Sequence, residues 1–543
     1  MKQPWEIQDF LTSENGQLHI DDVKAVELAK EFGSPLFVFS EGRIKHNIAR
    51  LRRVETVIDC PLKICYAAKA LSNMAILRAV REAGSDLEVN SGGELWKALK
   101  AGFRGDQIIF NGTSKEVWEI EMAVEAEIYA IQVDSLYELS LISDTAKRLG
   151  KRANVSLRLV PEIETNTHSG LQTALLTSKF GMMPDEAFAA FREYKDSPEL
   201  NLAGVHLHIG SQNPEPDVYT EALEILFANL LLVYKETGVK LSHINLGGGF
   251  PVNYSRGNTY PELPEKAQKE MEDILEKGYI ESKYSDGRVI RSPIPKEWVE
   301  SAAREKMFAA DYEPDSAIAD AWKQLRAKAS ETGAEELIDG LTVLLEPGRS
   351  IIADAGICLT TVRNIKERPI SNISDSMKSY GEAKLEADKE KSENGLNLSF
   401  GMYATGFSFT DPAITSERWL LTDAGFNILL SMETYKWYYQ LVSAQRSDAD
   451  HDSPYKVAGP LCDGGDVYFD IEGEGRLPDH RSLPEDVQPG EVLALLNCGA
   501  YSFAQAMEYN GRFLPAMVMI KENGDPELIR KRDTFEDLIR NDL

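Results

Sequence analysis

The sequence predicts a (β/α)₈ barrel followed by a second, β-rich domain, and three observations lead to this prediction. From Ile64 onward, eight short apolar segments alternate with helical patterns, which is typical of a parallel barrel sheet. After Glu346 the pattern changes to short alternating segments separated by turns, as in a β domain. The chain of 543 residues is also too long for one ordinary hydrophobic core, so two domains are expected.

The barrel strands are expected to follow one another along the chain, with helical patterns such as Ser72–Ala83, Gly93–Ala101 and Asp217–Thr237 between them. A further strand is expected earlier, at Leu36–Phe39. The eight expected barrel strands are Ile64–Ala68, Asp86–Val89, Ile108–Phe110, Ile131–Val133, Val155–Leu159, Val205–Ile209, Ile244–Leu246 and Val343–Leu345.

The expected domain division places residues 36–350 in the barrel and residues 351–543 in the β domain, which residues 1–35 join. Two stretches interrupt this order. Residues 252–340 are charged and helix-prone, so we expect an insertion beside the barrel. Residues 367–397 are rich in Ser, Lys, Glu, Asp and Asn, which predicts an exposed loop.

Composition excludes several classes of protein. With 43% apolar and 27% charged residues the chain is typical of a globular protein, and its net charge of −28 argues against a nucleic-acid partner. It contains no apolar run of membrane-spanning length, and its start does not resemble a signal peptide. The five cysteines are scattered without metal-ligand spacing, so we expect reduced thiols, no metal site and a cytoplasmic location.

A lysine lies at the end of the first predicted barrel strand. The segment KICYAAKA, residues 63–70, is typical of a buried strand, and Lys69 lies at its C-terminal end. An ammonium group on an apolar strand is costly unless it is paired or used chemically. A desolvated lysine loses basicity, and its neutral amine can form a Schiff base with a carbonyl compound. The alternative is a surface lysine on a half-exposed strand.

Two later strand ends carry groups suited to a phosphate and a flat heteroaromatic ring. Gly247, Gly248 and Gly249 directly follow a predicted strand, and without Cβ atoms they let several backbone N–H groups approach a phosphate. In the segment HIGSQ, the imidazole of His208 can stack on a ring, and Ser211 can donate to a phosphate. A flexible turn and a hydrogen-bonded core histidine are the alternatives.

Three further segments add charged and reactive groups. Glu346, at the end of the last predicted barrel strand, needs a positive partner if buried, and a protonated pyridine nitrogen or Arg349 would supply one. In the second domain, Cys462 can donate a proton and Asp463 can accept an ammonium group, although such a segment is more often a plain turn or a calcium-like loop. The phenol of Tyr501 can reach a phosphate, although a turn tyrosine is usually a packing residue.

Six ordered motifs resemble those of the fold-type III pyridoxal-phosphate decarboxylases. The motifs are YAAKA, HIGSQ, LGGGFP, EPGR, GPLCDGGD and CGAYSFAQAMEYNGR. The group includes diaminopimelate, ornithine and arginine decarboxylases and shares its barrel with alanine racemase. The resemblance extends from about Leu36 to the C-terminus, outside the two interruptions. Within the group, FRGDQIIFNG, VDSLYEL, AGPLCDGGD and the last residues NGDPELIRKRDTFEDLIRNDL look most like D-ornithine/D-lysine decarboxylases.

This resemblance implies pyridoxal 5′-phosphate as the cofactor and decarboxylation of a diamino acid as the reaction. By the resemblance, Lys69 would hold the cofactor covalently, His208 would stack on its ring, and Glu346 would pair with its ring nitrogen. Its phosphate would be bound by Ser211, Gly247, Gly248, Gly249, Gly348, Arg349 and Tyr501. Cys462 would act as a proton donor and would enter with Asp463 from a second subunit of a homodimer. The substrate would contact Arg349, Tyr435, Cys462, Asp463 and Tyr501.

One segment departs from the pattern of diaminopimelate decarboxylases. Those enzymes carry an Arg-Pro pair whose arginine binds the distal carboxylate, with a tyrosine three residues after the proline. Here Tyr435 remains, but Ser431 and Met432 replace the pair, and a serine cannot clamp a carboxylate in bidentate fashion. We therefore expect D-lysine or D-ornithine as the substrate. The alternatives are diaminopimelate decarboxylation to L-lysine, an amino-acid racemase and a catalytically silent regulatory homologue.

Overall fold

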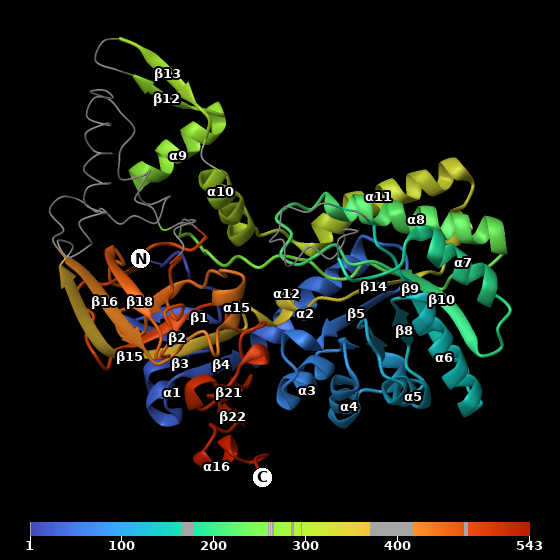
Figure 1. Ribbon diagram of the computed structural model, residues 1–543, viewed down its shortest axis with the longest axis horizontal. Helices are drawn as coiled ribbons and strands as arrows, with labels where there is room; N and C mark the ends of the chain where they lie inside the picture. The colour runs from blue at the N-terminus through green and yellow to red at the C-terminus, as the bar shows by residue number, and fades with distance from the viewer. Residues whose placement is uncertain are drawn as a thin grey trace.

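The structure of the protein is a computed structural model, which describes the chain except residues 1, 162, 164–177, 259, 261, 263–264, 284–286, 295, 370–415 and 472–475. Its two largest parts are a closed eight-stranded barrel and a nine-stranded sheet, which lie side by side (Figure 1). The expected loop at residues 367–397 falls almost wholly outside the described residues. None of the helices in the described ranges combines the length and apolarity needed to cross a membrane.

The predicted barrel is confirmed, with all neighbouring strands parallel. The strand expected at residues 205–209 starts earlier and ends at His206, which leaves His208 in the loop beyond it. The eight strands are β5 (Leu62–Ala67), β6 (Asp86–Val89), β7 (Ile108–Phe110), β8 (Ala130–Val133), β9 (Ala153–Arg158), β10 (Leu200–His206), β11 (His243–Asn245) and β14 (Thr342–Leu345).

Amphipathic helices with clear end signals cover the barrel. Ser91 and Ser135 each accept a hydrogen bond from the backbone N–H of the glutamate three residues later, and Gly102 and Gly150 end the same two helices in the left-handed conformation. The helices are α2 (Glu41–Arg52), α3 (Met74–Glu82), α4 (Gly92–Ala101), α5 (Val117–Glu125), α6 (Leu136–Leu149), α7 (Pro184–Tyr194), α8 (Val218–Thr237) and α11 (Pro314–Thr332).

The second sheet includes one strand that the sequence assigned to the barrel region. β4 (Leu36–Ser40) pairs with β15 (Gly356–Pro369) and β21 (Ala516–Ile520), so the barrel strands begin at Leu62. All five β4 residues are buried, and a wholly buried run does not reveal which sheet it joins. The remaining strands are β16 (Ser416–Thr422), β17 (Leu441–Ser443), β18 (Ser453–Ala458), β19 (Arg481–Leu483), β20 (Val492–Leu495) and β22 (Pro526–Arg530).

The N-terminal segment packs on this second sheet. Leu18 and Ile20 share a buried apolar cluster with Leu36, Val38 and Ile357, which are sheet residues. The segment contains β1 (Leu11–Glu14), β2 (Gln17–Ile20), β3 (Val23–Lys24) and α1 (Ala25–Phe32). Three short helices lie outside this segment: α12 (Arg349–Ile352), α15 (Leu430–Thr434) and α16 (Phe535–Leu538).

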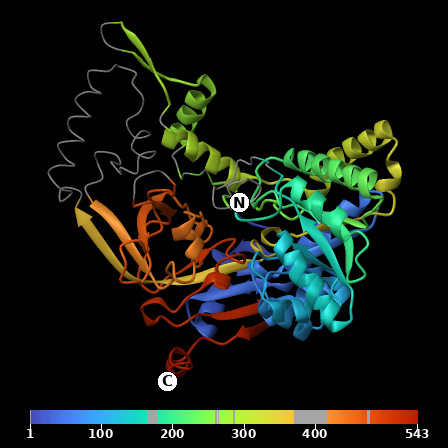
Figure 2. The ribbon, with the colours of Figure 1, turned by 45° about the vertical axis from the view of Figure 1, so that its right-hand side comes forward.

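The expected insertion is present but shorter than residues 252–340. Helix α9 (Glu265–Lys277), strands β12 (Ile280–Lys283) and β13 (Val289–Ser292), and helix α10 (Lys296–Ala309) project from the body in both views (Figures 1 and 2). Helix α11, which the sequence placed in the insertion, instead packs against α8 on the barrel through Ile318 and its other buried residues. Its exposed face carries the charges that made it look like part of the insertion. We call residues 252–309 the α9–α10 insertion.

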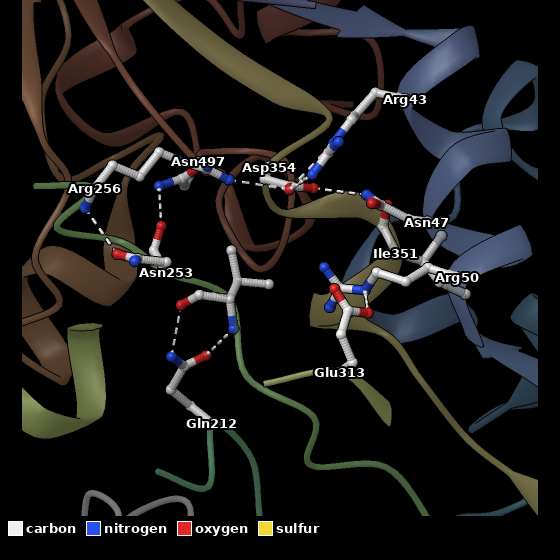
Figure 3. Close-up of polar contacts among 11 residues, drawn as sticks. Arg43, Asn47, Arg50, Gln212, Asn253, Arg256, Glu313, Ile351, Asp354 and Asn497 are labelled. Carbon is white, nitrogen blue, oxygen red and sulfur yellow. Dashed lines mark hydrogen bonds and ion pairs between the residues drawn. The ribbon is translucent and has the colours of Figure 1, made fainter. Parts of the chain in front are cut away.

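A single glutamine holds both ends of the α9–α10 insertion. Gln212 Nε2 donates to the carbonyl oxygen of Val252 at 2.7 Å, and its Oε1 accepts from Val252 N–H at 3.0 Å (Figure 3). The same Nε2 also donates to the carbonyl oxygen of Met307 at 2.8 Å. The fully buried amide therefore uses three hydrogen bonds to fix where the chain leaves the barrel and where it returns.

A buried carboxylate anchors the same root to the barrel. Asp354 accepts hydrogen bonds from Arg43 Nη2 at 2.6 Å, Asn47 Nδ2 at 2.6 Å and Arg256 Nη2 at 3.1 Å (Figure 3). Burial opposes the charge, but Arg43 and Arg256 lower the pKa of Asp354 to about 2. Helix α2 and the insertion root are thus joined through one ionised side chain.

Candidate active site

A cavity of about 310 Å³ lies where the C-terminal ends of the barrel strands face the second sheet. It collects most of the residues that the sequence singled out. A larger cavity, of about 790 Å³, contains none of them, so the chemistry favours the smaller one. The residues around the smaller cavity are Lys69, Asn90, Asn111, Arg158, Phe180, His206, His208, Ser211, Glu346, Arg349, Ser431, Tyr435, Trp437, Tyr501 and Gln505.

Lys69 projects into this cavity from a short turn, residues 68–70, that directly follows β5. Its neighbours Ala68 and Ala70 are buried, so only the lysine side chain enters the cavity. Burial lowers the pKa of Lys69, but Glu88, Tyr501 and Glu346 outweigh it and raise the pKa above its ordinary value. The expected loss of basicity is therefore wrong for the chain alone, because carboxylates on neighbouring strand ends stabilise the ammonium form.

Glu346 follows β14 and is held by amides from other strand ends. Asn245 Nδ2 donates to its Oε1 at 2.7 Å and Asn111 Nδ2 at 3.0 Å, while His206 Nε2 lies 3.4 Å from Oε2. Burial opposes ionisation, but the neighbouring imidazoles and Lys69 lower the pKa of Glu346 well below its ordinary value. The result is an oriented carboxylate inside the cavity.

The three glycines form a turn into which no side chain would fit. A Cβ on Gly247 would lie 2.5 Å from His208 Nδ1, and one on Gly248 would lie 2.5 Å from the carbonyl oxygen of Glu346. A Cβ on Gly249 would lie 2.4 Å from Asn213 Nδ2. The backbone N–H of Gly248 instead donates to His208 Nδ1 at 3.2 Å. The glycines thus let their own backbone approach the His208 imidazole, the Asn213 amide and the Glu346 carbonyl group closely.

The other polar end of the cavity is built around Arg349. Its Nε donates to Ser211 Oγ at 3.1 Å and its Nη1 to Tyr254 Oη at 2.9 Å. Its guanidinium carbon lies 4.1 Å from the ring centre of Trp437 and 4.9 Å from that of Tyr501. Arg349 therefore pairs with Ser211 and Tyr254 rather than forming the salt bridge with Glu346 that was the alternative.

These groups fit pyridoxal phosphate on the chemistry of the donors alone. Ser211 and Arg349 offer a hydroxyl and a guanidinium for a phosphate, and a Cβ on Gly348 would already touch Tyr501 Oη at 3.1 Å. Elsewhere the cavity offers the ionised carboxylate of Glu346 for the protonated ring nitrogen of the cofactor and the amine of Lys69 for its aldehyde. The imidazole of His208 also lines the cavity, beside the glycine turn.

Cys462 and Asp463 do not line the cavity of their own chain. Cys462 is exposed, and its backbone N–H donates to Asn510 Oδ1 at 2.6 Å. Asp463 accepts from Tyr509 Oη at 3.1 Å and from Gly465 N–H at 2.9 Å. The two residues lie on an exposed loop of the second sheet.

The segment that departs from the family pattern forms part of the cavity wall. Ser431 is the second residue of α15, and its Oγ lies 3.1 Å from both Tyr501 O and Gln505 Oε1. Tyr435 follows the same helix and also lines the cavity. Both hydrogen-bond partners of the Ser431 hydroxyl are therefore neutral.

Sequence reasoning missed six lining residues: Asn90, Asn111, Arg158, Phe180, Trp437 and Gln505. Asn90 and Asn111 directly follow β6 and β7, and Arg158 ends β9, so a search of every strand end would have found them. Asn111 Nδ2 also donates to Glu88 Oε1 at 2.8 Å, which joins Glu88 to Glu346 through one amide.

Comparison with known proteins identifies the family to which this fold is similar. Residues 44–288 match the family model described as "Pyridoxal-dependent decarboxylase, pyridoxal binding domain". Diaminopimelate decarboxylase from Methanothermobacter thermautotrophicus is 30% identical over 532 residues, which cover 98% of this chain and 97% of the relative.

Two crystal structures extend the comparison to the fold. The complex of diaminopimelate decarboxylase from M. jannaschii with L-lysine has a TM-score of 0.71 and 28% identity, covering 98% of each chain. The Helicobacter pylori enzyme with L-lysine has a TM-score of 0.66 and 25% identity, covering 95% of this chain and 98% of that one. The similarity therefore includes the barrel and the second sheet together.

Proposed function

The chain belongs to the fold-type III pyridoxal-phosphate-dependent decarboxylases, and from this premise we propose that it converts meso-diaminopimelate to L-lysine and CO₂. At the coarser level, it is a carboxy-lyase that acts on a diamino acid with pyridoxal phosphate as cofactor. The full-length similarity to diaminopimelate decarboxylases carries the choice of substrate. These relatives favour diaminopimelate over the D-lysine or D-ornithine expected from the sequence.

The proposed roles follow the geometry of the cavity. The cofactor held by these residues would supply an electron sink for the pair that departing CO₂ leaves at the α-carbon. Lys69 supplies the amine for the aldehyde and moves a proton at Nζ. The ionised Glu346, oriented by Asn245 and Asn111, keeps the ring nitrogen protonated. The imidazole of His208 supports the ring.

The remaining residues bind the ends of the reacting molecules. Ser211, Arg349, Tyr501 and the backbone of residues 247–249 would hold the phosphate; Arg349 and Ser211 already pair in the cavity wall, with Tyr501 beside the guanidinium. Tyr435, which also lines the cavity, would contact the substrate.

A homodimer with shared active sites completes this proposal. Cys462 and Asp463 are exposed and lie outside the cavity of their own chain. In the proposed dimer, Cys462 of one subunit donates the proton that replaces CO₂ in the other subunit's cavity, and Asp463 receives the substrate's distal ammonium group.

A second substrate class is favoured by one observation. The Ser431 hydroxyl has neutral hydrogen-bond partners in the cavity wall, and a serine cannot form the two parallel hydrogen bonds by which arginine binds a carboxylate. A D-amino acid with only an ammonium group at its distal end, such as D-lysine or D-ornithine, would suit that wall. Decarboxylation of such an amino acid is the second candidate function.

One assay separates the two candidates. The holoprotein is incubated with meso-diaminopimelate and with both enantiomers of lysine, ornithine and arginine, and CO₂ release is measured, with a Lys69→Ala variant as the blank. Release from diaminopimelate alone supports the first proposal. Release from D-lysine or D-ornithine but not from diaminopimelate contradicts it and supports the second. Racemisation without CO₂ release would exclude both.

A further inference from the structure

The last turns of helix α10 reach the wall of the candidate active site. Arg304 Nη2 donates to the carbonyl oxygen of Tyr435 at 3.1 Å and also to that of Lys436. The guanidinium is partly buried, and its Nε lies 3.4 Å from Tyr260 Oη, another residue of the α9–α10 insertion. One arginine of the insertion therefore binds two successive carbonyl groups beside the substrate cavity.

The turn that Arg304 holds has an unfavourable backbone conformation. Lys436 has φ of +47°, in the left-handed region that favours glycine. Trp437 N–H and Tyr435 N–H both donate to the carbonyl oxygen of Ser431, at 3.0 Å each, which closes the turn after α15. A lysine with this backbone conformation persists when surrounding contacts determine it, and Arg304 supplies two of those contacts.

Aromatic packing joins the same helix to the phosphate end of the cavity. Phe308 packs edge-on against Trp437, with ring centres 5.1 Å apart, and Tyr254 does so at 5.2 Å. Trp437 in turn stacks on the guanidinium of Arg349. Trp437 thus has support from these rings as well as from the turn, whereas the carbonyl groups of residues 435 and 436 face Arg304.

We propose that Arg304 is a positioning residue for substrate: from the α9–α10 insertion it fixes the turn at residues 431–437 and so places Tyr435 in the cavity. The inference rests on the proposed function in taking Tyr435 as a substrate contact. The root of the insertion is fixed to the barrel through Gln212 and Asp354, so α10 forms a rigid support behind the cavity wall (Figure 3). The insertion thereby has a role in substrate binding although no residue of its projecting part lines the cavity in the described ranges.

The test compares Arg304→Met with Arg304→Lys and with a matched Arg291→Met control. Arg291 lies on β13 of the same insertion, and its side chain is 63% exposed. Three quantities are measured on the holoprotein: hydrogen exchange in the peptide covering residues 431–439, the dissociation constant of pyridoxal phosphate, and kcat and KM for the active amino acid.

Arg304→Met should speed exchange in that peptide and raise KM about tenfold, because charge-assisted hydrogen bonds to two carbonyl groups are lost. The kcat and the cofactor dissociation constant should each change by less than about threefold, since the aromatic rings still hold Trp437. Arg304→Lys keeps a charged donor and should give an intermediate KM, and Arg291→Met should match the wild type.

Unchanged exchange and KM in Arg304→Met would overturn the proposal. So would loss of cofactor affinity in proportion to KM, which would indicate general unfolding of the site. Should Arg304→Met not fold, an Arg304→Lys variant with wild-type KM and exchange would overturn it equally. If the wild type releases CO₂ from no amino acid, the proposed function fails, and the exchange data still decide whether Arg304 fixes the turn.

Discussion

The imidazole Nδ1 of His208 accepts a hydrogen bond from the backbone N–H of Gly248 at 3.2 Å. Because Nδ1 is the acceptor, the neutral ring carries its proton on Nε2. Burial, together with Lys69 and Arg158, lowers the pKa of His208 well below its ordinary value, which favours this neutral form. The glycine turn thus determines both the tautomer and the orientation of the ring.

Replacing Gly248 by alanine should weaken cofactor binding. The new Cβ would meet the carbonyl oxygen of Glu346 at 2.5 Å, and overpacking of this kind costs about 1–3 kcal/mol. We expect the dissociation constant of pyridoxal phosphate to rise roughly five- to a hundredfold, measured by titrating the stripped protein. Gly42→Ala, where the nearest atom would lie at 3.8 Å, is the control and should bind normally. Wild-type affinity in Gly248→Ala would show that the turn does not cradle the phosphate.

Glu346→Gln should slow decarboxylation with little effect on folding. The amide keeps the size of the side chain but removes the charge that would hold a proton on the ring nitrogen, so the barrier should rise by on the order of several kcal/mol. Single-turnover CO₂ release measures this step directly. An exposed control, Glu335→Gln, should react like the wild type. Near-normal rates in Glu346→Gln would refute the assigned role.

Borohydride reduction of the holoprotein should join the cofactor to Lys69. A reduced bond survives digestion, so mass spectrometry of the peptide containing residue 69 should show the added mass. Lys97, whose Nζ lies 3.0 Å from Ser72 Oγ, serves as an internal control and should remain unlabelled. Labelling of any other lysine would move the chemistry away from this cavity.

Glu88 should make the cofactor-free protein less stable as the pH rises. Burial, only partly offset by Lys69, raises the pKa of Glu88 from 4.5 to about 7. Between these values the folded state keeps a proton that the unfolded state has released, so stability falls with rising pH and levels off above pH 7. The melting temperature of Glu88→Gln relative to wild type should therefore increase from pH 5 to pH 8. A pH-independent difference would contradict the raised pKa.

Mixing two inactive variants should restore activity if the active sites are shared. Lys69→Ala and Cys462→Ala each damage both sites of their own homodimer, but a mixed dimer would contain one site with both residues intact. Random exchange of subunits should then recover about a quarter of the wild-type activity. Variants that remain inactive after denaturation and co-refolding, under conditions that restore the wild type, would exclude shared sites.

Much of this architecture could be predicted because the functional residues of a (β/α)₈ barrel lie at the C-terminal ends of its strands. Lys69, Gly248 and Glu346 each follow a predicted strand, and the cavity brings all three neighbourhoods together. The strands themselves were recognisable as short apolar runs between turns. The sequence did not reveal which sheet β4 joins, because a strand with five buried residues has the same pattern in either sheet.

The pairwise contacts that tune the site were beyond the reach of sequence patterns. Asn245 and Glu346 are 101 residues apart and meet because β11, which ends at Asn245, pairs directly with β14, which Glu346 follows. The basicity of Lys69 depends on Glu88, which comes from the neighbouring strand. An argument from desolvation alone therefore predicted the wrong direction for the pKa shift of Lys69. The contact from Arg304 to residues 435 and 436 likewise requires the second sheet to stand beside the insertion.

The three bonds of Gln212 have a consequence for how this protein can vary. Because one side chain binds both Val252 and Met307, the chain leaves and returns at neighbouring points. We therefore expect the outer hairpin to accept a longer, shorter or engineered segment without a shift of the barrel strands on either side.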